Sequence, residues 1–274
     1  MIKDSDITTI WVDLSKFYFW VEAHFHQYLI DLDRQGKPVI IMNGGFVCAA
    51  NVAARNLGII IDHEYKQRDL IRTINPVKVI ARGKNYSPGD VSRIELYRHE
   101  ADELVKLIMP LEGHGCKVIH PYVDDVVVYV YGDFKKADGI AKQLEEICNQ
   151  QHYPGYSGIG INPTYGRMAC HSAKKGKHDK FTWDYLKSEV FNWTVDEGGS
   201  VRNILYIGIE TTKNLNELDV HTIGQLYNIL LHVNDLDIEQ ERLSNVLGLL
   251  SQRVITGVLG KYTISQKKEL EKVL

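Results

Sequence analysis

The stretch ITTIWVDLSKFYFWVE, residues 7–22, contains the pattern that decides the fold. Its first half is apolar and rich in β-branched residues, which predicts a buried strand over Thr8–Asp13. Ser15 follows as a possible cap for a helix that runs to about Tyr28. The strand therefore brings a carboxylate, Asp13, to a helix N-terminus, where exposed backbone N–H groups favour phosphate oxygens.

A second acidic site occurs in HPYVDDVVVYVYG, residues 120–132. An isolated Asp124–Asp125 pair is most simply a turn between strands, but the valines on both sides disfavour a plain solvent-exposed turn. Successive side chains on a regular strand point to opposite faces, so only one of the two can face Asp13 squarely. A strand end or bulge near Pro121 can bring the other around, and Asp125 is the less certain ligand. Three carboxylates at two strand edges predict a divalent-metal site, because Mg2+ prefers oxygen ligands.

Composition indicates a globular protein: of 274 residues, 44% are hydrophobic and 24% charged. The sequence contains neither an apolar run long enough to span a membrane nor the apolar core of a signal peptide, which predicts a soluble intracellular protein, cytoplasmic (in the nucleoid) or nuclear. The four cysteines are far apart and show no CxxC spacing, so we expect neither a zinc site nor disulfides. They are expected to be buried as small hydrophobic residues.

The overall charge does not favour nucleic-acid binding. The net charge is -3 and the sequence pI is about 6.4, whereas neutralising phosphates usually requires a basic face. Charge is nevertheless segregated locally, since RMACHSAKKGKHDK, residues 167–180, carries four lysines. This segment is the best candidate for a phosphate-binding patch, and a solvated loop after a helix is the alternative.

The remaining pattern predicts an α+β fold. Residues 38–42 and 46–50 are expected to form strands around a Gly44–Gly45 turn, and the further predicted elements are a helix 52–57 ended by Gly58, a strand 77–81, a helix 87–109, a hairpin 116–131, a helix 135–150, a strand 156–161 and a helical stretch 239–259. The order strand, helix, hairpin, helix, strand, with an insertion before the first long helix, resembles a ferredoxin-like fold.

Five motifs, in this order and spacing, resemble the Y family of DinB/UmuC-type translesion DNA polymerases. VDLSKFYFWVE resembles the first acidic motif and YVDDVVVYV the second. KPVIIMNGGFVCAANVAARNLGI resembles the fingers, GIGINPTYGRMACHSAKKGK the closing strand and helix of the palm, and VRNILYIGIETTKNLNELDVHTIGQL the helix-hairpin-helix of the thumb. The resemblance covers about residues 7–250. It implies a ferredoxin-like palm (1–30 and 77–175), an inserted small fingers subdomain (31–76), an all-α thumb (176–255) and a C-terminal tail (256–274).

The resemblance also implies residue roles. The catalytic acids would be Asp13, Asp124 and Asp125, which with the backbone carbonyl of Leu14 would hold two Mg2+ ions, or Mn2+ in their place. Glu22 would close the first motif. The nucleotide-binding residues would be Phe17, Tyr18, Arg55 and Lys174, with Tyr18 excluding a ribose 2'-hydroxyl, and the DNA-binding residues would be Lys175, Lys177 and Gly208. The implied partners are primer–template DNA, deoxynucleoside triphosphates and a sliding clamp or another replication or repair protein, without a membrane.

Several departures from the family pattern leave two main hypotheses open. Asp125 replaces the usual glutamate, Val52 replaces a tyrosine, Glu210 stands at a glycine position of the hairpin, and the choice between Lys174 and Lys175 is open. After the thumb there is no room for the family's β-rich little-finger domain, so the sequence is either the catalytic core of a longer chain or a naturally short protein that relies on a partner. The first hypothesis is a template-directed, low-fidelity translesion DNA polymerase that transfers a deoxynucleotide to a primer 3'-hydroxyl. The second is a catalytically weak or inactive Y-family-like DNA-binding accessory protein in DNA damage tolerance, and a nucleotide cyclase on a similar palm is a distant third.

Overall fold

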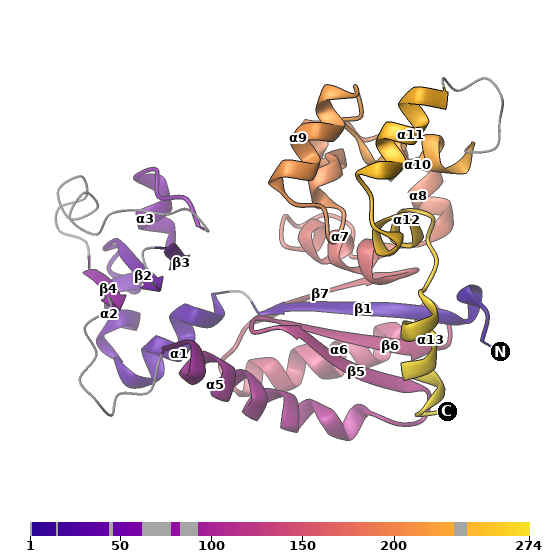
Figure 1. Cartoon of the computed structure of the whole chain (residues 1–274). Helices are drawn as coiled ribbons and strands as arrows, with labels where there is room; N and C mark the ends of the chain where they lie inside the picture. The colour runs from indigo at the N-terminus through magenta and orange to yellow at the C-terminus, as the bar shows by residue number, and fades with distance from the viewer. Residues whose placement is uncertain (1, 15, 44–45, 62–77, 83–92, 233–239) are drawn as a thin grey trace.

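The computed structural model describes residues 2–14, 16–43, 46–61, 78–82, 93–232 and 240–274 (Figure 1). Within these residues no helix is long and apolar enough to cross a membrane. The strands are β1 (Ile7–Leu14), β2 (Val39–Asn43), β3 (Phe46–Ala50), β4 (Lys78–Arg82), β5 (Cys116–Tyr122), β6 (Asp125–Tyr131), β7 (Gly155–Gly160) and β8 (Lys180–Phe181). The α-helices are α1 (Phe17–Phe25), α2 (Tyr28–Arg34), α3 (Val52–Asn56), α5 (Arg93–Ile108), α6 (Phe134–Gln150), α7 (Pro163–Ala173), α8 (Trp183–Ser188), α9 (Ile209–Glu217), α10 (Ile223–Leu231), α11 (Gln240–Gly248), α12 (Gln252–Val258) and α13 (Ile264–Glu271). Short 3-10 or π-helical turns are η1 (Asp4–Asp6), η2 (Met109–Leu111), η3 (Val190–Asn192), η4 (Val195–Gly199) and η5 (Val201–Asn203).

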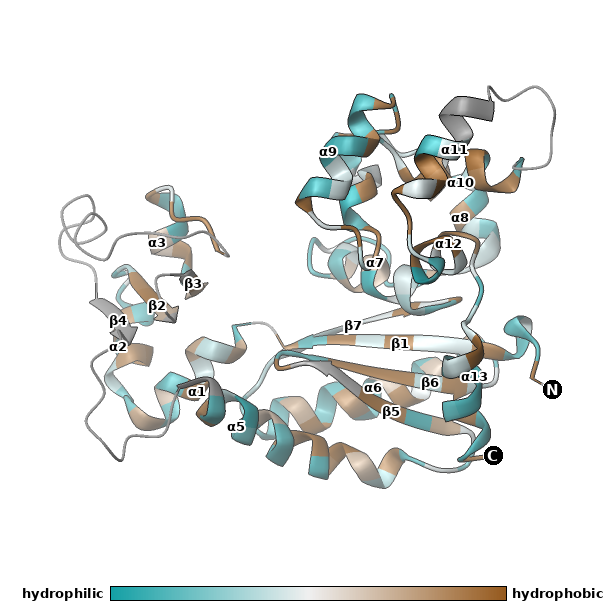
Figure 2. Ribbon diagram, viewed as in Figure 1, coloured by the Kyte–Doolittle hydropathy of each residue, from teal (hydrophilic) through white to brown (hydrophobic). Residues whose placement is uncertain are grey.

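The larger sheet has the strand order β5-β6-β1-β7-β8 and is antiparallel except for the β7–β8 pair. Along β1, side chains alternate between the two faces. Ile10, Val12 and Leu14 join the core that also contains the buried face of α5 and α6, whereas Ile7 and Trp11 belong to a separate cluster on the opposite face. Figure 2 shows hydrophobic residues along β6 and alternating bands of both kinds along α5 and α6. The protein is therefore of the expected α+β class.

Two glycines allow α7 to lie directly on the larger sheet. A Cβ atom on Gly158 would stand 1.9 Å from the backbone nitrogen of Cys170, and one on Gly160 would stand 2.2 Å from that of Gly166. Asn162 caps the helix by accepting the N–H of Tyr165, and a proline occupies its first turn. This close packing carries the C-terminal end of α7, with its lysines, toward the end of β1.

The smaller sheet has the order β3-β2-β4, and β4 runs parallel to β2. The strand expected at residues 77–81 within the palm thus pairs in the smaller sheet. Asn51 organises this unit, because its side-chain oxygen accepts the N–H groups of Val39 and Ala54 while its amide group donates to Asp33. The predicted Gly44–Gly45 turn lies outside the described residues.

The helices α8 to α12 form a separate cluster above the larger sheet (Figure 1). Buried aliphatic side chains hold it together, among them Leu186, Leu215, Ile223, Leu226, Val246 and Val254. The helical stretch expected over 239–259 is split in two, because Ser251 caps a new helix, α12, after α11 has ended. Asn162 and Tyr165 of α7 donate hydrogen bonds to backbone carbonyls of α12, which fixes this cluster to the sheet unit.

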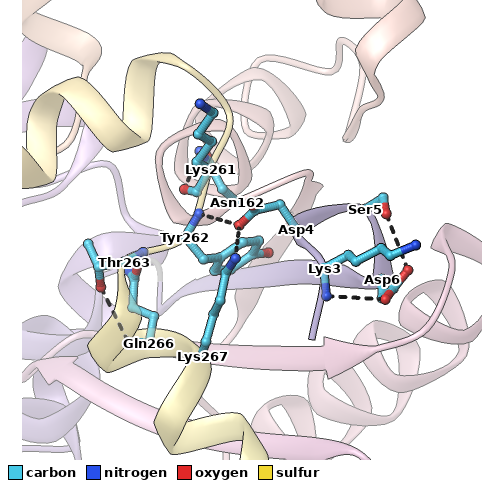
Figure 3. Close-up of polar contacts among 10 residues, drawn as sticks. All are labelled: Lys3, Asp4, Ser5, Asp6, Asn162, Lys261, Tyr262, Thr263, Gln266 and Lys267. Carbon is cyan, nitrogen blue, oxygen red and sulfur yellow. Dashed lines mark hydrogen bonds and ion pairs between the residues drawn. The ribbon is translucent and has the colours of Figure 1, made fainter. Parts of the chain in front are cut away.

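The C-terminal segment, residues 261–274, returns to the larger sheet beside the N-terminus (Figure 3). Asp4 Oδ1 accepts the backbone N–H of Tyr262 at 2.9 Å and forms an ion pair with Lys267 Nζ at 3.0 Å. The Tyr262 hydroxyl is 2.8 Å from Thr9 Oγ1, and Gln266 donates to the Tyr129 hydroxyl. Leu270 is fully buried. This tail forms a helix, α13, which the sequence pattern did not predict.

Local differences from the predicted elements are few. The helix expected to reach Tyr28 ends at Phe25, since His26 leaves the helical region with φ −136°, and α2 follows as a second helix. Lys16, with a left-handed φ of 59°, stands at the N-cap, while Ser15 lies outside the described residues. All four cysteines are free thiols, and three of them are buried as expected, whereas Cys48 is half-buried.

Candidate active site

The acids Asp13 and Asp125 lie directly opposite each other on the neighbouring strands β1 and β6. Residues opposed in this way have side chains on the same face of the sheet. Asp124 is instead in the two-residue turn before β6, where its backbone carbonyl accepts the N–H of Leu14 at 2.9 Å. The expectation that Asp125 would be the worse-placed of the pair is therefore corrected: β6 begins at Asp125, which faces Asp13 across the strands.

Negative charge is concentrated at this edge of the sheet. Burial, together with the negative charges of Asp13 and Asp124, raises the pKa of Asp125 to about 7. A hydrogen bond from Trp11 Nε1 to Asp125 Oδ1, 2.9 Å long, and the positive charge of Arg167 act in the opposite direction. A cation placed here would favour the ionised carboxylate.

These donors fit a hard divalent cation, because all three are carboxylates and their mutual repulsion is relieved by positive charge. In the part of the chain that the structure describes, no group of three or more His, Cys, Asp or Glu side chains is already arranged to hold a metal ion. The carbonyl oxygen of Leu14, at the end of β1, is a further oxygen donor at the same edge.

Lys174 provides the positive charge nearest to these acids. It is the C-cap of α7, and its ammonium group forms an ion pair with Asp13 Oδ2. Burial and the positive charges of Arg167 and Lys174 lower the pKa of His171, one turn earlier, to about 4, so this imidazole is neutral at neutral pH. The geometry places Lys174, rather than the exposed Lys175, in contact with Asp13.

A cavity of about 310 Å3 lies between the C-terminal end of α7 and residues 193–203. Its lining includes the charged side chains of Lys174, Lys175, Lys177 and Glu197, and the ring of Trp193. Three ammonium groups against one carboxylate give the cavity a positive character, which suits an anionic group such as a phosphate. The basic segment predicted from the sequence therefore faces a cavity next to the acids.

Helix α1 holds the predicted nucleotide-binding aromatics in different ways. Phe17 is only 1% exposed and its side chain packs in the core, which leaves its backbone as the part that a nucleotide could contact. Tyr18 is half-buried, and its ring meets that of Tyr97 edge to face at a centroid distance of 4.8 Å. The Tyr97 hydroxyl donates to Glu22, which is fully buried, at 2.7 Å.

Tyr97 contacts the predicted site residue Tyr18 but was not itself predicted as a site residue. The signal was a tyrosine on the apolar face of a predicted helix, where a buried hydroxyl needs a hydrogen-bond partner. Its partner, Glu22, is the acid that closes the first motif. The hydrogen bond from Tyr97 to Glu22 thereby joins α5 to α1, the helix that follows β1.

The other predicted site residues lie on elements away from the end of β1. Arg55 and Val52 are exposed on α3 in the smaller unit, and Gly208 is the N-cap of α9 in the helical cluster (Figure 1). Glu210 is exposed in the first turn of α9. The structure therefore brings together Asp13, Asp125 and Lys174. It leaves Arg55 on α3 of the smaller unit and Gly208 at the N-cap of α9 in the helical cluster.

Comparison with known proteins gives a family assignment. Residues 12–171 match the impB/mucB/samB family. This segment is more than half of the chain and includes Asp13, Asp124 and Asp125. The chain belongs to this family. The Y-family resemblance expected from the five motifs is thus confirmed. No match is found among curated proteins.

Solved structures of Y-family polymerases share the fold. DinB from Sulfolobus solfataricus is 17% identical, with a TM-score of 0.58 over 90% of this chain and 69% of that one. The insertion ternary complex of Dbh DNA polymerase is also 17% identical, with a TM-score of 0.59 and the same coverage of both chains. The post-insertion binary complex of Dbh reaches a TM-score of 0.63 at 17% identity, over 93% of this chain and 68% of that one.

Proposed function

We propose that the protein is a template-directed, low-fidelity DNA polymerase of the translesion type, which transfers a deoxynucleotide to a primer 3'-hydroxyl with two Mg2+ ions, or Mn2+ in their place. The observation that carries this proposal is the placement of Asp13 opposite Asp125 at one sheet edge, both within the segment that matches the family, with the ammonium group of Lys174 paired to Asp13. Primer–template DNA and deoxynucleoside triphosphates are the partners that this reaction requires.

In this proposal each structural unit has a role. The larger sheet with α5 to α7 serves as the palm, the smaller sheet with α2 and α3 as the fingers, and the cluster α8 to α12 as the thumb. The pairing of β4 with β2 supports extending the fingers from residue 76 to residue 82. The tail from residue 256 onward ends against the palm.

The acids would hold the ions through Asp13, Asp124, Asp125 and the carbonyl of Leu14. When bound, the ions neutralise charge on the triphosphate and lower the pKa of the primer hydroxyl. The ammonium group of Lys174 pairs with Asp13. A cation held by that carboxylate would compete with this ion pair, and the ammonium group would then be available to donate to a phosphate oxygen.

Substrate selection and DNA contact are assigned to the surrounding residues. Tyr18, held edge to face by Tyr97, provides a rigid ring that restricts the space at the sugar. Arg55 is assigned to the triphosphate, and Lys175 and Lys177 to DNA phosphates at the basic cavity. The backbone at Gly208 is open to a phosphate, since no atom lies within 4 Å of an added Cβ there.

A second candidate function is a DNA-binding accessory protein with little or no catalytic activity. Two observations favour it: the high pKa of Asp125, which disfavours the ionised form that a metal needs, and the exposed carboxylate of Glu210 beside the hairpin that would approach a phosphate. Both candidates predict DNA binding, so only catalysis separates them.

Primer extension with all four deoxynucleotides, in Mg2+ and in Mn2+, tests the proposal. We expect extension by the unaltered protein and its loss in Asp13→Ala, whereas Asp102→Ala, which removes an exposed carboxylate of α5, should leave extension unchanged. Extension no greater than that of Asp13→Ala with either metal would exclude the polymerase. Retained binding to primer–template DNA in that case would favour the accessory function.

A further inference from the structure

Trp11 contacts the site through a hydrogen bond to Asp125 but is not one of its acids. Its side chain is 2% exposed, and its Nε1 donates to Asp125 Oδ1 at 2.9 Å. Tryptophan has one polar atom, a donor with no acceptor capacity. Trp11 stands two residues before Asp13 on the same face of β1, diagonal to Asp125 on β6, a separation that a long aromatic side chain can bridge.

The indole is fixed by close packing. It belongs to a buried cluster with Val127 and Tyr129 of β6, Cys170 of α7, and Tyr262 and Leu270 of the tail. On β7 the residue opposite Trp11 is Gly158, against which α7 packs without room for a Cβ. The ring therefore has no space to turn without opening this cluster, and its N–H points to one place.

Asp125 has a particular need for such a donor. Its side chain is one methylene shorter than a glutamate, a loss of roughly 1.5 Å in reach. The negative charges of Asp13 and Asp124 also act on its carboxylate. The hydrogen bond from Trp11 to Oδ1 limits rotation of the carboxylate and leaves the lone pairs of Oδ2 for a cation.

We propose that Trp11 is a positioning residue of the metal site: its indole N–H orients the short Asp125 carboxylate so that Oδ2 can ligate a divalent cation. This inference rests on the proposed function for the identity of the ligand. It goes further in assigning a role to a buried aromatic residue that touches neither metal nor substrate.

Mn2+ affinity of the full chain, measured by calorimetry and electron paramagnetic resonance without DNA or nucleotide, tests this role. Removing a hydrogen bond that orients a metal ligand typically weakens metal binding roughly 10–100-fold. Trp11→Phe, which keeps a ring but loses the donor, should weaken Mn2+ binding by about tenfold or more. The metal concentration for half-maximal primer extension should rise by a similar factor, while the KM for deoxynucleotide at saturating metal stays unchanged.

Trp20 offers a matched control. Its Nε1 is buried and has no hydrogen-bond partner in the described part of the chain, so Trp20→Phe removes an indole N–H that orients nothing. We expect its Mn2+ affinity to equal that of the unaltered protein. Equal affinities of Trp11→Phe and Trp20→Phe would overturn the proposal.

A longer acid provides the rescue. In Trp11→Phe/Asp125→Glu, the added methylene extends the reach of the carboxylate, and Mn2+ affinity should recover at least partly. A double variant that binds Mn2+ no better than Trp11→Phe alone would contradict a positioning role. If Trp11→Phe does not fold, nuclear magnetic resonance of the unaltered protein provides the test. Addition of Mg2+ should shift the indole N–H resonance of Trp11 and leave that of Trp20 unchanged. A Trp11 resonance that does not shift would refute the inference.

The two proposals fail in different ways. If Mn2+ binding depends on Trp11 as expected but no primer is extended, the polymerase function is refuted and the role of Trp11 is supported. If primers are extended and the metal requirement of Trp11→Phe equals that of the unaltered protein, the polymerase function is supported and the role of Trp11 is refuted. Absence of Mn2+ binding in the unaltered protein would overturn the inference directly.

Discussion

The buried carboxyl of Asp125 should make the metal-free protein less stable as pH rises. Its pKa is raised from 3.8 to about 7 in the folded chain. A raised folded-state pKa means that folding favours the protonated form, so the contribution to stability is complete below the unfolded pKa and is lost as pH rises through about 7. Between pH 5 and pH 8 this linkage removes about 2–3 kcal/mol from the free energy of unfolding.

Asp125→Asn isolates this contribution. The amide oxygen can still accept the indole N–H of Trp11, while the titrating charge is gone. Urea unfolding in the presence of a chelator, at several pH values from 5 to 8, should show the variant gaining stability relative to the unaltered protein by about 2–3 kcal/mol across that range. His171, whose lowered pKa also links stability to pH, is present in both proteins and cancels in the difference.

Two further measurements sharpen this test. Asp102→Asn, on the exposed side of α5, should show a stability difference that does not change with pH. Mg2+ added at pH 8 should stabilise the unaltered protein more than Asp125→Asn, because a ligand that binds only the folded state stabilises it. Parallel pH profiles for Asp125→Asn and the unaltered protein would show that Asp125 is not held in an unfavourable charged state.

Other residues give further predictions. Tyr18→Ala should increase ribonucleotide incorporation by the polymerase, and an unchanged preference for deoxynucleotides would refute its role at the sugar. Lys174→Gln should raise the KM for deoxynucleotide by about tenfold, because a charge-assisted hydrogen bond is lost; an unchanged KM would assign the triphosphate to another cation. Asp4→Ala should lower the free energy of unfolding by about 1 kcal/mol, since it removes an acceptor of the tail, and equal urea midpoints would contradict this. Gly158→Ala should cost about 3 kcal/mol or more through its clash with α7, whereas Gly139→Ala, with open space around it, should not destabilise the protein in the same thermal-unfolding assay.

Local sequence patterns were sufficient to predict most of the elements around the site. Strand β1 and the β5–β6 hairpin follow from runs of β-branched residues, and α6 follows as the helix expected over residues 135–150. The strand pattern predicted that one acid of the Asp124–Asp125 pair shares a face with Asp13, but not that this acid is Asp125. The Y-family motifs then gave the order of the units.

Features that depend on non-local contacts were not predictable. The strand after residue 77 has no local signal that selects its partner, and it pairs with β2 instead of the larger sheet. The turn before β6 includes Asp124, whose backbone carbonyl accepts the N–H of Leu14 from another strand.

The docking of the tail has a consequence for the order of folding during synthesis. Tyr262 bonds to Asp4 and Thr9, which precede it by 258 and 253 positions in the chain. Cys170 of α7 packs in the same cluster, but the part of this face that Tyr262 and Leu270 cover, with Trp11 and Tyr129, stays exposed until residues 262–270 have left the ribosome. Contacts of such long sequence separation slow folding and prolong the exposure of apolar surface. The first strand of the protein to be made is thus among the last to be fully enclosed, and the nascent chain offers chaperones an aromatic surface for nearly the whole of its synthesis.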